Sequence, residues 1–485
     1  MNLKDIDRNK TNVKNKEKSL LKNTGILALG TLSSKIFMFL LLPLYTAALS
    51  AEDYGGVDLL QTIASFIIPF VTLQLSSAMF RFIIEKKDEH RQSVVITTAI
   101  ILEVINIFIF MIFVFIINIF SPIRYCLLFV VYFILLVTLE MVQNIVRGFG
   151  NNILYSAMSF VMTVVSLVTN IILILGFGMK GESILIASSL SYFIVIVLGF
   201  FKQELWKYIR YVNFSFVQLK EMLAYCLPLI PNEVSWWVAN ASDRILVSYF
   251  IGAANNGIYA AANKIPTIYT TIYKVYNTAW VESLSRSFGD DDQYEFINNM
   301  YSKSLKLFGS ICLGIISVMS LIFSKIIGIN YAESYTHIYI LMIAILFNSI
   351  CSLYGGIFTA FKKSGIIGKT TVIGAVINIL INILLIRFIG LYAASISTLV
   401  SYIVIFITRH IEVKKIMDLK WPKIYVVQFI FMFIITTTGY FLRINSLNFI
   451  VLSVLCIWSY FSNKELIDNI VITVYNKSIL KLFKG

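Results

Sequence analysis

The sequence is poor in charged residues. Asp, Glu, Lys and Arg together make up 14% of its 485 residues, whereas an average soluble domain has about 25%. Hydrophobic residues account for 58% of the chain, and the mean hydropathy is +0.82. Such a chain has too little polar surface to cover a core in water. The composition therefore excludes a soluble globule and predicts an integral membrane protein.

Residues for catalysis or metal binding are also scarce. The 5 cysteines stand singly in apolar runs and the 3 histidines have no ligand-like neighbours, so neither a disulfide framework nor a metal site is predicted. Residues 365–370 match only part of a phosphate-binding loop, because Lys363 stands where that motif needs a glycine. We expect a transporter, with no catalytic residues and no bound cofactor.

What the sequence does contain is a series of apolar runs, each about 20 residues long, the length of a transmembrane helix. It predicts an all-α polytopic membrane protein with about fourteen transmembrane helices. The predicted spans are residues 24–48, 57–80, 93–119, 123–146, 153–175, 182–201, 221–250, 257–280, 301–328, 334–360, 367–388, 391–410, 423–442 and 446–462.

Basic residues are distributed unevenly between the two sides of these spans. The formal net charge is +14, yet almost all Lys and Arg outside the spans fall on the side of the N-terminal tail. The opposite side carries only Arg124, Lys180, Arg387 and Arg443. This positive-inside pattern predicts an even number of spans with both termini in the cytoplasm. It makes membrane lipids, rather than nucleic acid, the expected partner of the positive charge.

The chain also repeats itself. Residues 49–63 align with 251–265, and residues 149–170 align with 361–382. Six spans followed by six of the same orientation predict two bundles related by a pseudo-twofold axis along the membrane normal. The predicted organisation is a basic cytoplasmic tail (1–22), an N-terminal six-helix bundle (23–201), a cytoplasmic linker (202–220), a C-terminal six-helix bundle (221–410), two additional transmembrane helices (411–462) and a cytoplasmic tail (463–485).

Several charged residues lie inside predicted spans, where a charge costs about 2.5–3.5 kcal/mol and usually faces a cavity or a partner. Helical spacing puts four of the side chains of span 221–250 on one face: Glu233, Trp237, Asn240 and Arg244. A cationic cavity for an anionic headgroup is predicted from Arg244, Lys264, Lys35 and Lys274. Two alternatives stay open. Arg244 could form an ion pair with Asp243 or another carboxylate, and lysines near helix ends could reach the interface.

Acidic residues within the spans form a second set of candidates. They are interpreted as counter-ions or as groups for proton or sodium coupling: Asp243, Glu233, Glu103 and Glu140. Trp236 and Trp237 are either packing residues or stacking surfaces for a sugar. Pro228 and Pro231 predict a kink in the span over 221–250.

Two segments carry a family resemblance. They are NTGILALGTLSSKIFMFLLLPLYTAALSAEDYGGVDLLQTIASFIIPF and ASDRILVSYFIGAANNGIYAAANKI. They resemble the start and the second half of Wzx-type polysaccharide flippases, which belong with the MATE-like exporters to the MOP superfamily. Arg244 and Lys264 fall within matched segments, so the resemblance implies that both line the family's cationic cavity.

The resemblance also implies a function. It is that of a multi-pass transporter of the bacterial cytoplasmic membrane that flips undecaprenyl-pyrophosphate-linked oligosaccharide from the inner to the outer leaflet. Alternating access, often with ion coupling, is the implied mechanism, and surface polysaccharide biosynthesis is the implied process. The implied partners of this monomer are the lipid-linked oligosaccharide, a polysaccharide polymerase and glycosyltransferases.

Other classes remain as alternatives. An exporter of drugs or small solutes, or a flippase for lipid-linked peptidoglycan precursors, shares the architecture. A major-facilitator transporter is disfavoured because the loop after the second span, RFIIEKKDEHRQS, lacks that class's G-x-x-x-D-R-x-G-R pattern. A polysaccharide polymerase or ligase is disfavoured because every predicted outer loop is short.

Overall fold

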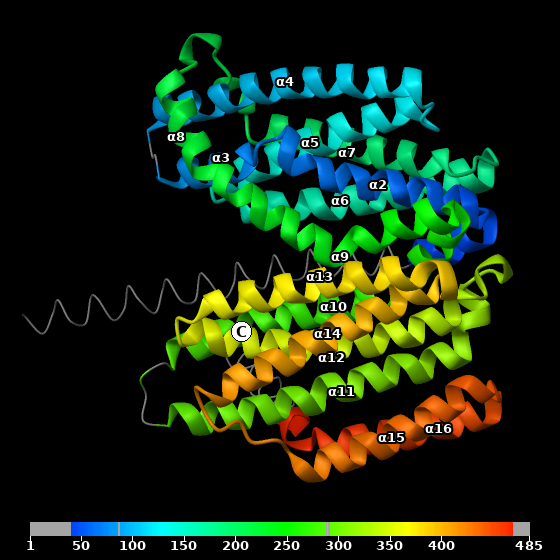
Figure 1. The fold of residues 1–485 in the computed structure, drawn as a ribbon. Coiled ribbons are helices and arrows are strands. Elements are labelled where there is room, and N and C mark those ends of the chain that lie inside the picture. The colour runs from blue at the N-terminus through cyan, green and yellow to red at the C-terminus, as the bar shows by residue number, and fades with distance from the viewer. Residues whose placement is uncertain (1–39, 86–87, 288, 290–291, 469–485) are drawn as a thin grey trace, which may run out of the picture. The chain divides into compact units, whose positions relative to one another are not determined.

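The computed structural model describes residues 40–85, 88–287, 289 and 292–468. Within this part of the chain all regular structure is helical (Figure 1). The chain forms two compact units, residues 1–257 (unit 1) and residues 258–485 (unit 2). The boundary between them falls inside one long helix, α10 (Ala253–Arg286).

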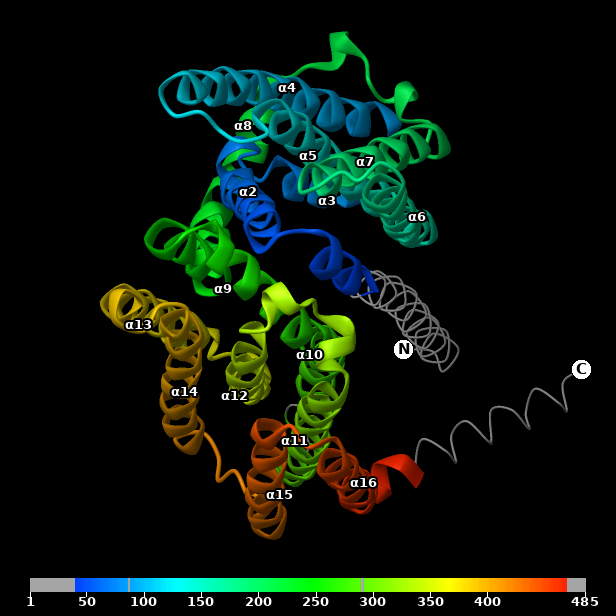
Figure 2. The ribbon, with the colours of Figure 1, turned by 90° about the vertical axis from the view of Figure 1, so that its right-hand side faces the viewer.

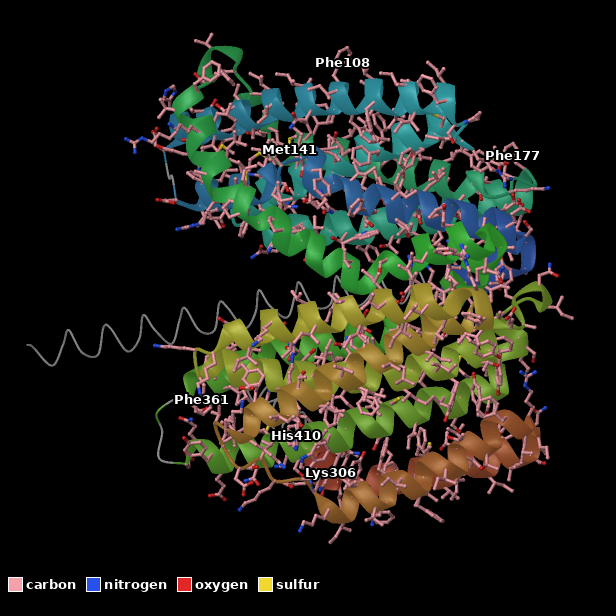
Figure 3. The ribbon with its side chains drawn as sticks, in the orientation of Figure 1. Phe108, Met141, Phe177, Lys306, Phe361 and His410 are labelled. Atoms are coloured by element: carbon pink, nitrogen blue, oxygen red, sulfur yellow. The ribbon has the colours of Figure 1, made fainter. Side chains whose placement is uncertain are left out.

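Unit 1 is a set of long helices packed around an apolar core. Helix α5 contacts α3, α4, α6 and α7, and α9 packs against α2. Met141 of α5, labelled in Figure 3, belongs to this core together with Met79, Ile96 and Met222 from three other helices. The helices of unit 1 are residues 40–48, α2 (Ala51–Val71), α3 (Leu75–Glu85), α4 (Glu89–Phe120), α5 (Cys126–Gly148), α6 (Asn152–Ile171), η1 (Ile172–Gly176), α7 (Glu182–Lys202), η2 (Leu205–Lys207), η3 (Tyr211–Asn213), α8 (Phe216–Cys226), η4 (Leu227–Leu229) and α9 (Ile230–Ile251).

Unit 2 begins with most of α10 and continues through six further long helices. Helix α14 packs against α12 and α13, while α15 and α16 pack against α11 and against each other (Figure 2). Tyr335 and Tyr440 join α12 to α15, because their rings stack at 4.0 Å and each hydroxyl donates to the other's carbonyl. The remaining helices of unit 2 are α11 (Gln293–Ile326), η5 (Ile329–Tyr331), α12 (Ser334–Ala360), α13 (Ser364–Ile389), α14 (Tyr392–Lys414), α15 (Lys423–Leu442) and α16 (Asn445–Ser462).

The helices have the character of membrane spans. In the described residues, 11 helices are long and apolar enough to cross a bilayer. Their outward faces are apolar as well: Phe108 of α4 is 59% exposed and points away from the unit in Figure 3. A water-soluble helix would carry polar residues there. The prediction of an all-α polytopic membrane protein is confirmed.

The count of fourteen spans stays a prediction. Most of the span predicted over 24–48 lies outside the described residues, which include only its last part, helical over 40–48. The spans predicted over 221–250 and 257–280 correspond to α9 and α10. These two helices are not among the 11, and they carry five of the eight charged residues singled out above: Glu233, Asp243, Arg244, Lys264 and Lys274.

Two of the predicted spans are not single continuous α-helices. The span over 57–80 is two helices, because Leu73 and Gln74 adopt left-handed backbone angles between α2 and α3. The span over 221–250 is interrupted by the 3₁₀ turn η4, which contains Pro228. The backbone angles of Leu227, Leu229 and Ile230 stay in the right-handed helical region. The predicted kink therefore lies at a short 3₁₀ segment between α8 and α9, where proline removes a backbone donor.

The turns at the start of α2 and α10 are shorter than the sequence suggested. Helix α2 begins at Ala51 because Ser50 caps it, its Oγ accepting the backbone N–H of Asp53 at 3.0 Å. The predicted spans leave residues 251–256 between them, and the structure shortens this connection to Gly252, whose φ is +92°. Gly55 and Gly257 lie inside α2 and α10.

Gly55 and Gly257 allow two helices to approach each other closely. A Cβ added at Gly55 would overlap the carbonyl oxygen of Ala253, and one added at Gly257 would overlap that of Ala51. In the repeat, Gly55 corresponds to Gly257 and Ala51 to Ala253, so the two contacts are equivalent by the repeat. Such reciprocal contacts are the signature of a local twofold axis, here within unit 1 where α2 crosses the first turn of α10.

Hydrogen bonds from hydroxyl groups of α4 hold the segment that follows α7. Ser93 and Thr97 both donate to the carbonyl of Tyr208, at 2.6 and 3.1 Å. Thr98 accepts the backbone N–H of Ser215 at 3.1 Å. The residues predicted as a linker, 202–220, are thus bonded to the first turns of α4. The predicted domain boundaries themselves stay predictions.

Candidate functional site

A polar seam runs between α2 and α9 in unit 1. On α2, Asp58, Thr62 and Ser65 follow one another at spacings of four and three, which places them on one face. On α9, Trp237 and Arg244 are two turns apart and face them. The indole Nε1 of Trp237 donates to Ser65 Oγ at 2.9 Å, and Arg244 bonds to the other two residues. The predicted shared face of Trp237 and Arg244 is confirmed.

Arg244 is held by a carboxylate. Its Nη1 lies 3.2 Å from Oδ1 of Asp58 and 3.4 Å from Oγ1 of Thr62. The other carboxylate oxygen of Asp58 accepts from Nδ2 of Asn256 at 3.4 Å, and the same amide donates to the carbonyl of Gly55 at 2.8 Å. One of the two alternatives for Arg244, an ion pair with a carboxylate other than Asp243, is therefore present.

The two partners differ in how far they reach toward the surface. The side chain of Asp58 is 6% exposed, whereas that of Arg244 is 28% exposed. Among the described residues, Nη1 is the only nitrogen of Arg244 that makes hydrogen bonds. A guanidinium has five N–H donors, so most of them remain available at the edge of the seam. This arrangement positions a cation while leaving it able to bind a further anion.

Asp58 was not selected from the sequence. It lies in the motif LSAEDYGGVDLLQTI, inside a run otherwise suited to a membrane span. Its partner is 186 residues away, so no helical spacing joins them. The signal that could have found it is the carboxylate within an apolar span, the same signal that selected Glu103 and Glu140. Asp243, the neighbour of Arg244, is buried at 8% exposure.

Trp237 packs rather than standing free. Its ring centroid lies 4.5 Å from that of Phe66 of α2, at an interplanar angle of 44°. Together with the bond to Ser65, this contact favours the packing interpretation of Trp237. The side chain of Trp236 lies outside the described residues.

A second polar cluster lies between α3, α4 and α5. Glu103 of α4 is completely buried, and Glu140 of α5 accepts a hydrogen bond from Ser76 of α3 at 2.7 Å. Both side chains border one apolar core, to which Ala99, one turn before Glu103, and Leu139 and Met141, on either side of Glu140, belong. The structure thus brings together two of the four acidic candidates, from different helices, while Glu233 of α9 is exposed.

The predicted lysines are in a different unit or outside the described residues. Lys264 is half-buried and Lys274 is exposed, both on the part of α10 that belongs to unit 2. Lys35 lies outside the described residues. The prediction that these lysines and Arg244 line one cationic cavity stays a prediction.

One buried cation was missed by the sequence analysis. Arg409 of α14, near His410 (labelled in Figure 3), is 6% exposed and bonds to oxygens of α12 and α13. It stands at the end of an apolar span, where hydropathy alone places it among the cytoplasmic arginines. No cluster of three or more metal-ligating side chains occurs among the residues that the structure describes.

Comparison with protein families decides the relationship. The model of the family described as "Polysaccharide biosynthesis protein" matches residues 20–288, more than half of the chain. The chain belongs to this family. The resemblance to Wzx-type flippases noted in the sequence is thereby confirmed, and the seam between α2 and α9 lies within the matched residues. Comparison with curated proteins gives no match.

Solved structures show the same fold. The lipid II flippase MurJ in an inward closed conformation is similar with a TM-score of 0.65 and 17% identity, over 91% of this chain and 99% of that chain. An inward-facing multidrug resistance MATE family transporter of the MOP superfamily is similar with a TM-score of 0.64 and 15% identity, over 80% of this chain and 95% of that chain. The Vibrio cholerae MATE transporter VcmN is similar with a TM-score of 0.54 and 14% identity, over 82% of this chain and 97% of that chain. The family member described here therefore has the MOP-superfamily fold.

Proposed function

We propose that the protein is a flippase that moves undecaprenyl-pyrophosphate-linked oligosaccharide from the inner to the outer leaflet of the bacterial cytoplasmic membrane, for the synthesis of a surface polysaccharide. Membership of the polysaccharide biosynthesis family supports the process, and the MOP-superfamily fold supports transport across a membrane. In this proposal both termini lie in the cytoplasm, as the distribution of Lys and Arg indicates.

The observation that carries the proposal is the arrangement of Arg244. Taking a pyrophosphate group out of water removes its hydration, which is very costly for an isolated charge. A guanidinium binds phosphate oxygens through paired, charge-assisted hydrogen bonds and replaces part of that hydration. Arg244 is fixed through Nη1, while its other donors make no hydrogen bond within the part of the chain that the structure describes. It is therefore suited to receive the headgroup while the lipid tail stays in the bilayer.

Asp58 has a defined part in this mechanism. When no headgroup is bound, it neutralises Arg244, so that neither charge is left alone in a segment surrounded by hydrocarbon. When the headgroup arrives, its phosphate oxygens compete with Asp58 for the guanidinium. Asn256 still donates to Asp58, which limits the cost of losing Arg244. The exchange lets substrate bind and leave without an orphaned charge.

Export of surface polysaccharide by cells that depend on this protein tests the role of Arg244. We expect Arg244→Ala to lower export by about tenfold or more, because a hydrogen bond to a charged group contributes about 1.5–3 kcal/mol. Arg244→Lys should retain part of the activity. Arg387→Ala, which removes an exposed arginine from the end of α13, is the matched control and should export normally. Normal export by Arg244→Ala at wild-type membrane abundance contradicts the assignment.

The choice of substrate needs its own experiment, because the shared fold does not select it. In vesicles containing the purified chain, we expect flipping of undecaprenyl-pyrophosphate-linked oligosaccharide to exceed that of lipid II, the substrate in the name of one structural relative. Deletion of the protein should leave drug resistance of the cells unchanged. Faster flipping of lipid II would favour a flippase for peptidoglycan precursors instead. Lost drug resistance would favour a drug exporter.

A further inference from the structure

Helix α4 carries a carboxyl group on its buried face. Glu103 is completely buried, and one turn before it Ala99 is completely buried too. Two turns after it, Phe110 packs on Phe133 of α5 with ring centroids 4.0 Å apart. Glu103 therefore points into the interior of unit 1 and not toward lipid, because side chains three to four residues apart on a helix share a face.

Nothing in the described part of the chain bonds to this carboxyl group. Both oxygens of Glu103 are buried without a hydrogen-bond partner there, and so is Nδ2 of Asn106, one turn further along the same face. A buried, ionised carboxylate without a partner is strongly unfavourable, whereas the protonated acid loses far less on leaving water. The surroundings of Glu103 therefore suit the protonated form.

A second carboxyl group of unit 1 lies nearer the surface. Glu140 of α5 is partly exposed and accepts a hydrogen bond from Ser76 of α3. It borders the same core as Glu103, because Leu139 and Met141 on either side of it and Ala99, one turn before Glu103, belong to one cluster of buried side chains. Acidic residues on neighbouring helices form the proton relays of membrane proteins.

Other charged groups on the packed helices are engaged elsewhere. Arg81 and Glu85 of α3 face each other 3.8 Å apart on the exposed surface, and Arg147 of α5 lies over the rings of Phe80 and Tyr155. The remaining charged or titratable groups described on helices α2, α5 and α8 are Glu52, Asp53 with Arg124, Tyr54, Asp58 with Arg244, Cys126, Tyr132, Lys220, Glu221, Tyr225 and Cys226. The two aspartates are paired with their arginines, whereas Glu52, Lys220, Glu221 and Tyr225 are exposed. Tyr132 packs on the ring of Tyr192, and Cys226 belongs to the apolar core.

We propose that Glu103 is a proton-binding site within unit 1, and that Glu140 passes the proton between Glu103 and the surface. Protonation of Glu103 favours the arrangement in which α3, α4 and α5 enclose it, and loss of the proton favours one that exposes it to water. The proton is transferred from one carboxyl oxygen to another, so no further reactant is needed. The use of this proton to drive flipping rests on the proposed function, whereas its presence on Glu103 does not.

Infrared spectroscopy of the full-length chain in lipid vesicles tests the proposal without any substrate. The C=O stretching band of a protonated carboxylic acid should be present in the wild type at neutral pH. Glu103→Gln should remove the intensity of a single carboxyl group. Glu221→Gln, on the exposed face of α8, is the matched control and should leave the band unchanged. An undiminished band in Glu103→Gln overturns the proposal, and so does loss of the wild-type band when sodium chloride is added at constant pH.

A second variant keeps the test decisive if Glu103→Gln does not fold. On transfer to D₂O the band shifts as the proton is exchanged for deuterium, and the rate reports access to Glu103. Glu140→Gln should slow this exchange severalfold because the relay is removed, while Glu85→Gln should not. Unchanged exchange in Glu140→Gln contradicts the relay. If the band behaves as expected but the purified chain flips no undecaprenyl-pyrophosphate-linked oligosaccharide in vesicles, the proton site stands and the proposed function fails.

Discussion

Two arginines are held inside helices of this protein in opposite ways. Arg409 of unit 2 is 6% exposed, and all its side-chain nitrogens donate to neutral oxygens of Thr370, Thr371, Cys351 and Ile367. Arg244 of unit 1 has a side chain that is 28% exposed and donates through Nη1 alone, to Asp58 and Thr62. The more deeply buried arginine has no carboxylate among these partners, and the more exposed one does.

The difference separates a structural arginine from one suited to bind a ligand. Arg409 ties α12, α13 and α14 together and has no nitrogen without a bond. Without it, each of these oxygens would lose one donor, although Thr370 and Thr371 would keep their bonds to the carbonyls of Ile366 and Ile367. Arg244 is neutralised by a group that another anion can replace, and among the described residues most of its donors make no hydrogen bond. Burial and charge alone therefore do not separate the two arginines. The completeness of hydrogen bonding does, and it makes Arg244 the candidate for ligand binding.

The largest expected effect on stability is that of Arg409→Met. It removes the side chain through which α14 donates hydrogen bonds to α12 and α13, and each such bond contributes about 0.5–1.5 kcal/mol. We expect the folded fraction in detergent to melt at a clearly lower temperature and membrane abundance to fall. Size-exclusion chromatography after heating measures both. Export per molecule of folded protein should stay normal. If Arg409→Met lost export without losing stability, Arg409 would be a ligand-binding residue like Arg244, and the difference between the two arginines would not hold.

Arg244→Met should destabilise less and inactivate more. Asp58 keeps its bond to Asn256, and the lost pair is partly exposed, so we expect a loss of about 2 kcal/mol or less. Export should fall by about tenfold or more for the reason given above. The same heating experiment, run beside Arg409→Met, compares the two stabilities directly. A larger drop in melting temperature for Arg244→Met than for Arg409→Met breaks the comparison.

Asp58→Asn sharpens the comparison further. Asparagine keeps the shape and can still accept from Arg244, but it cannot neutralise the charge. If Asp58 only holds Arg244 between substrates, export should fall a few-fold, less than in Arg244→Met, and Arg244→Met/Asp58→Asn should be no worse than Arg244→Met alone. A double-mutant cycle on export measures this coupling. Equal loss in both single variants indicates instead that the intact ion pair is what export requires.

Thr371→Val should have the smallest effect. It removes one of the two bonds of Nη2 of Arg409 and leaves the other, to the carbonyl of Ile367. One such hydrogen bond contributes about 1 kcal/mol, so the melting temperature should fall slightly and export should be unaffected. A large drop shows that the bonds of Arg409 act as a cooperative network rather than singly.

Much of the fold was predictable because the bilayer demands it. Apolar runs of the required length predicted most of the long helices to within a few residues, for instance α15, predicted and found at 423–442, whereas α11 begins at Gln293 and its predicted span at 301. Helical spacing predicted that Trp237 and Arg244 share a face. The breaks were harder to see. Pro228 gave a signal for η4, but Leu73 and Gln74, between α2 and α3, belong to residue types that normally continue a helix, so composition offered no warning.

The partners of the candidate residues were not predictable in the same way. Asp58 meets Arg244 across 186 residues, and Glu140 meets Ser76 across 64. Periodicity along one helix says which side chains share a face, but it does not say which helix that face meets. Similarly, the sequence counted Arg409 among cytoplasmic charges because hydropathy cannot tell a helix end in water from one enclosed by neighbouring helices.

The sequence by itself determined that the chain spans a membrane, where its helices lie, and which family it resembles, because each of these depends on local composition, spacing or motif. The tertiary structure alone decided that Arg244 is paired with Asp58, that Arg409 is saturated by neutral oxygens, and that Glu103 is buried with no hydrogen-bond partner among the described residues. These depend on which helix faces which. Packing over the whole unit decides which helices meet. It thereby decides whether a charged group is fully hydrogen-bonded or keeps donors or acceptors for a ligand.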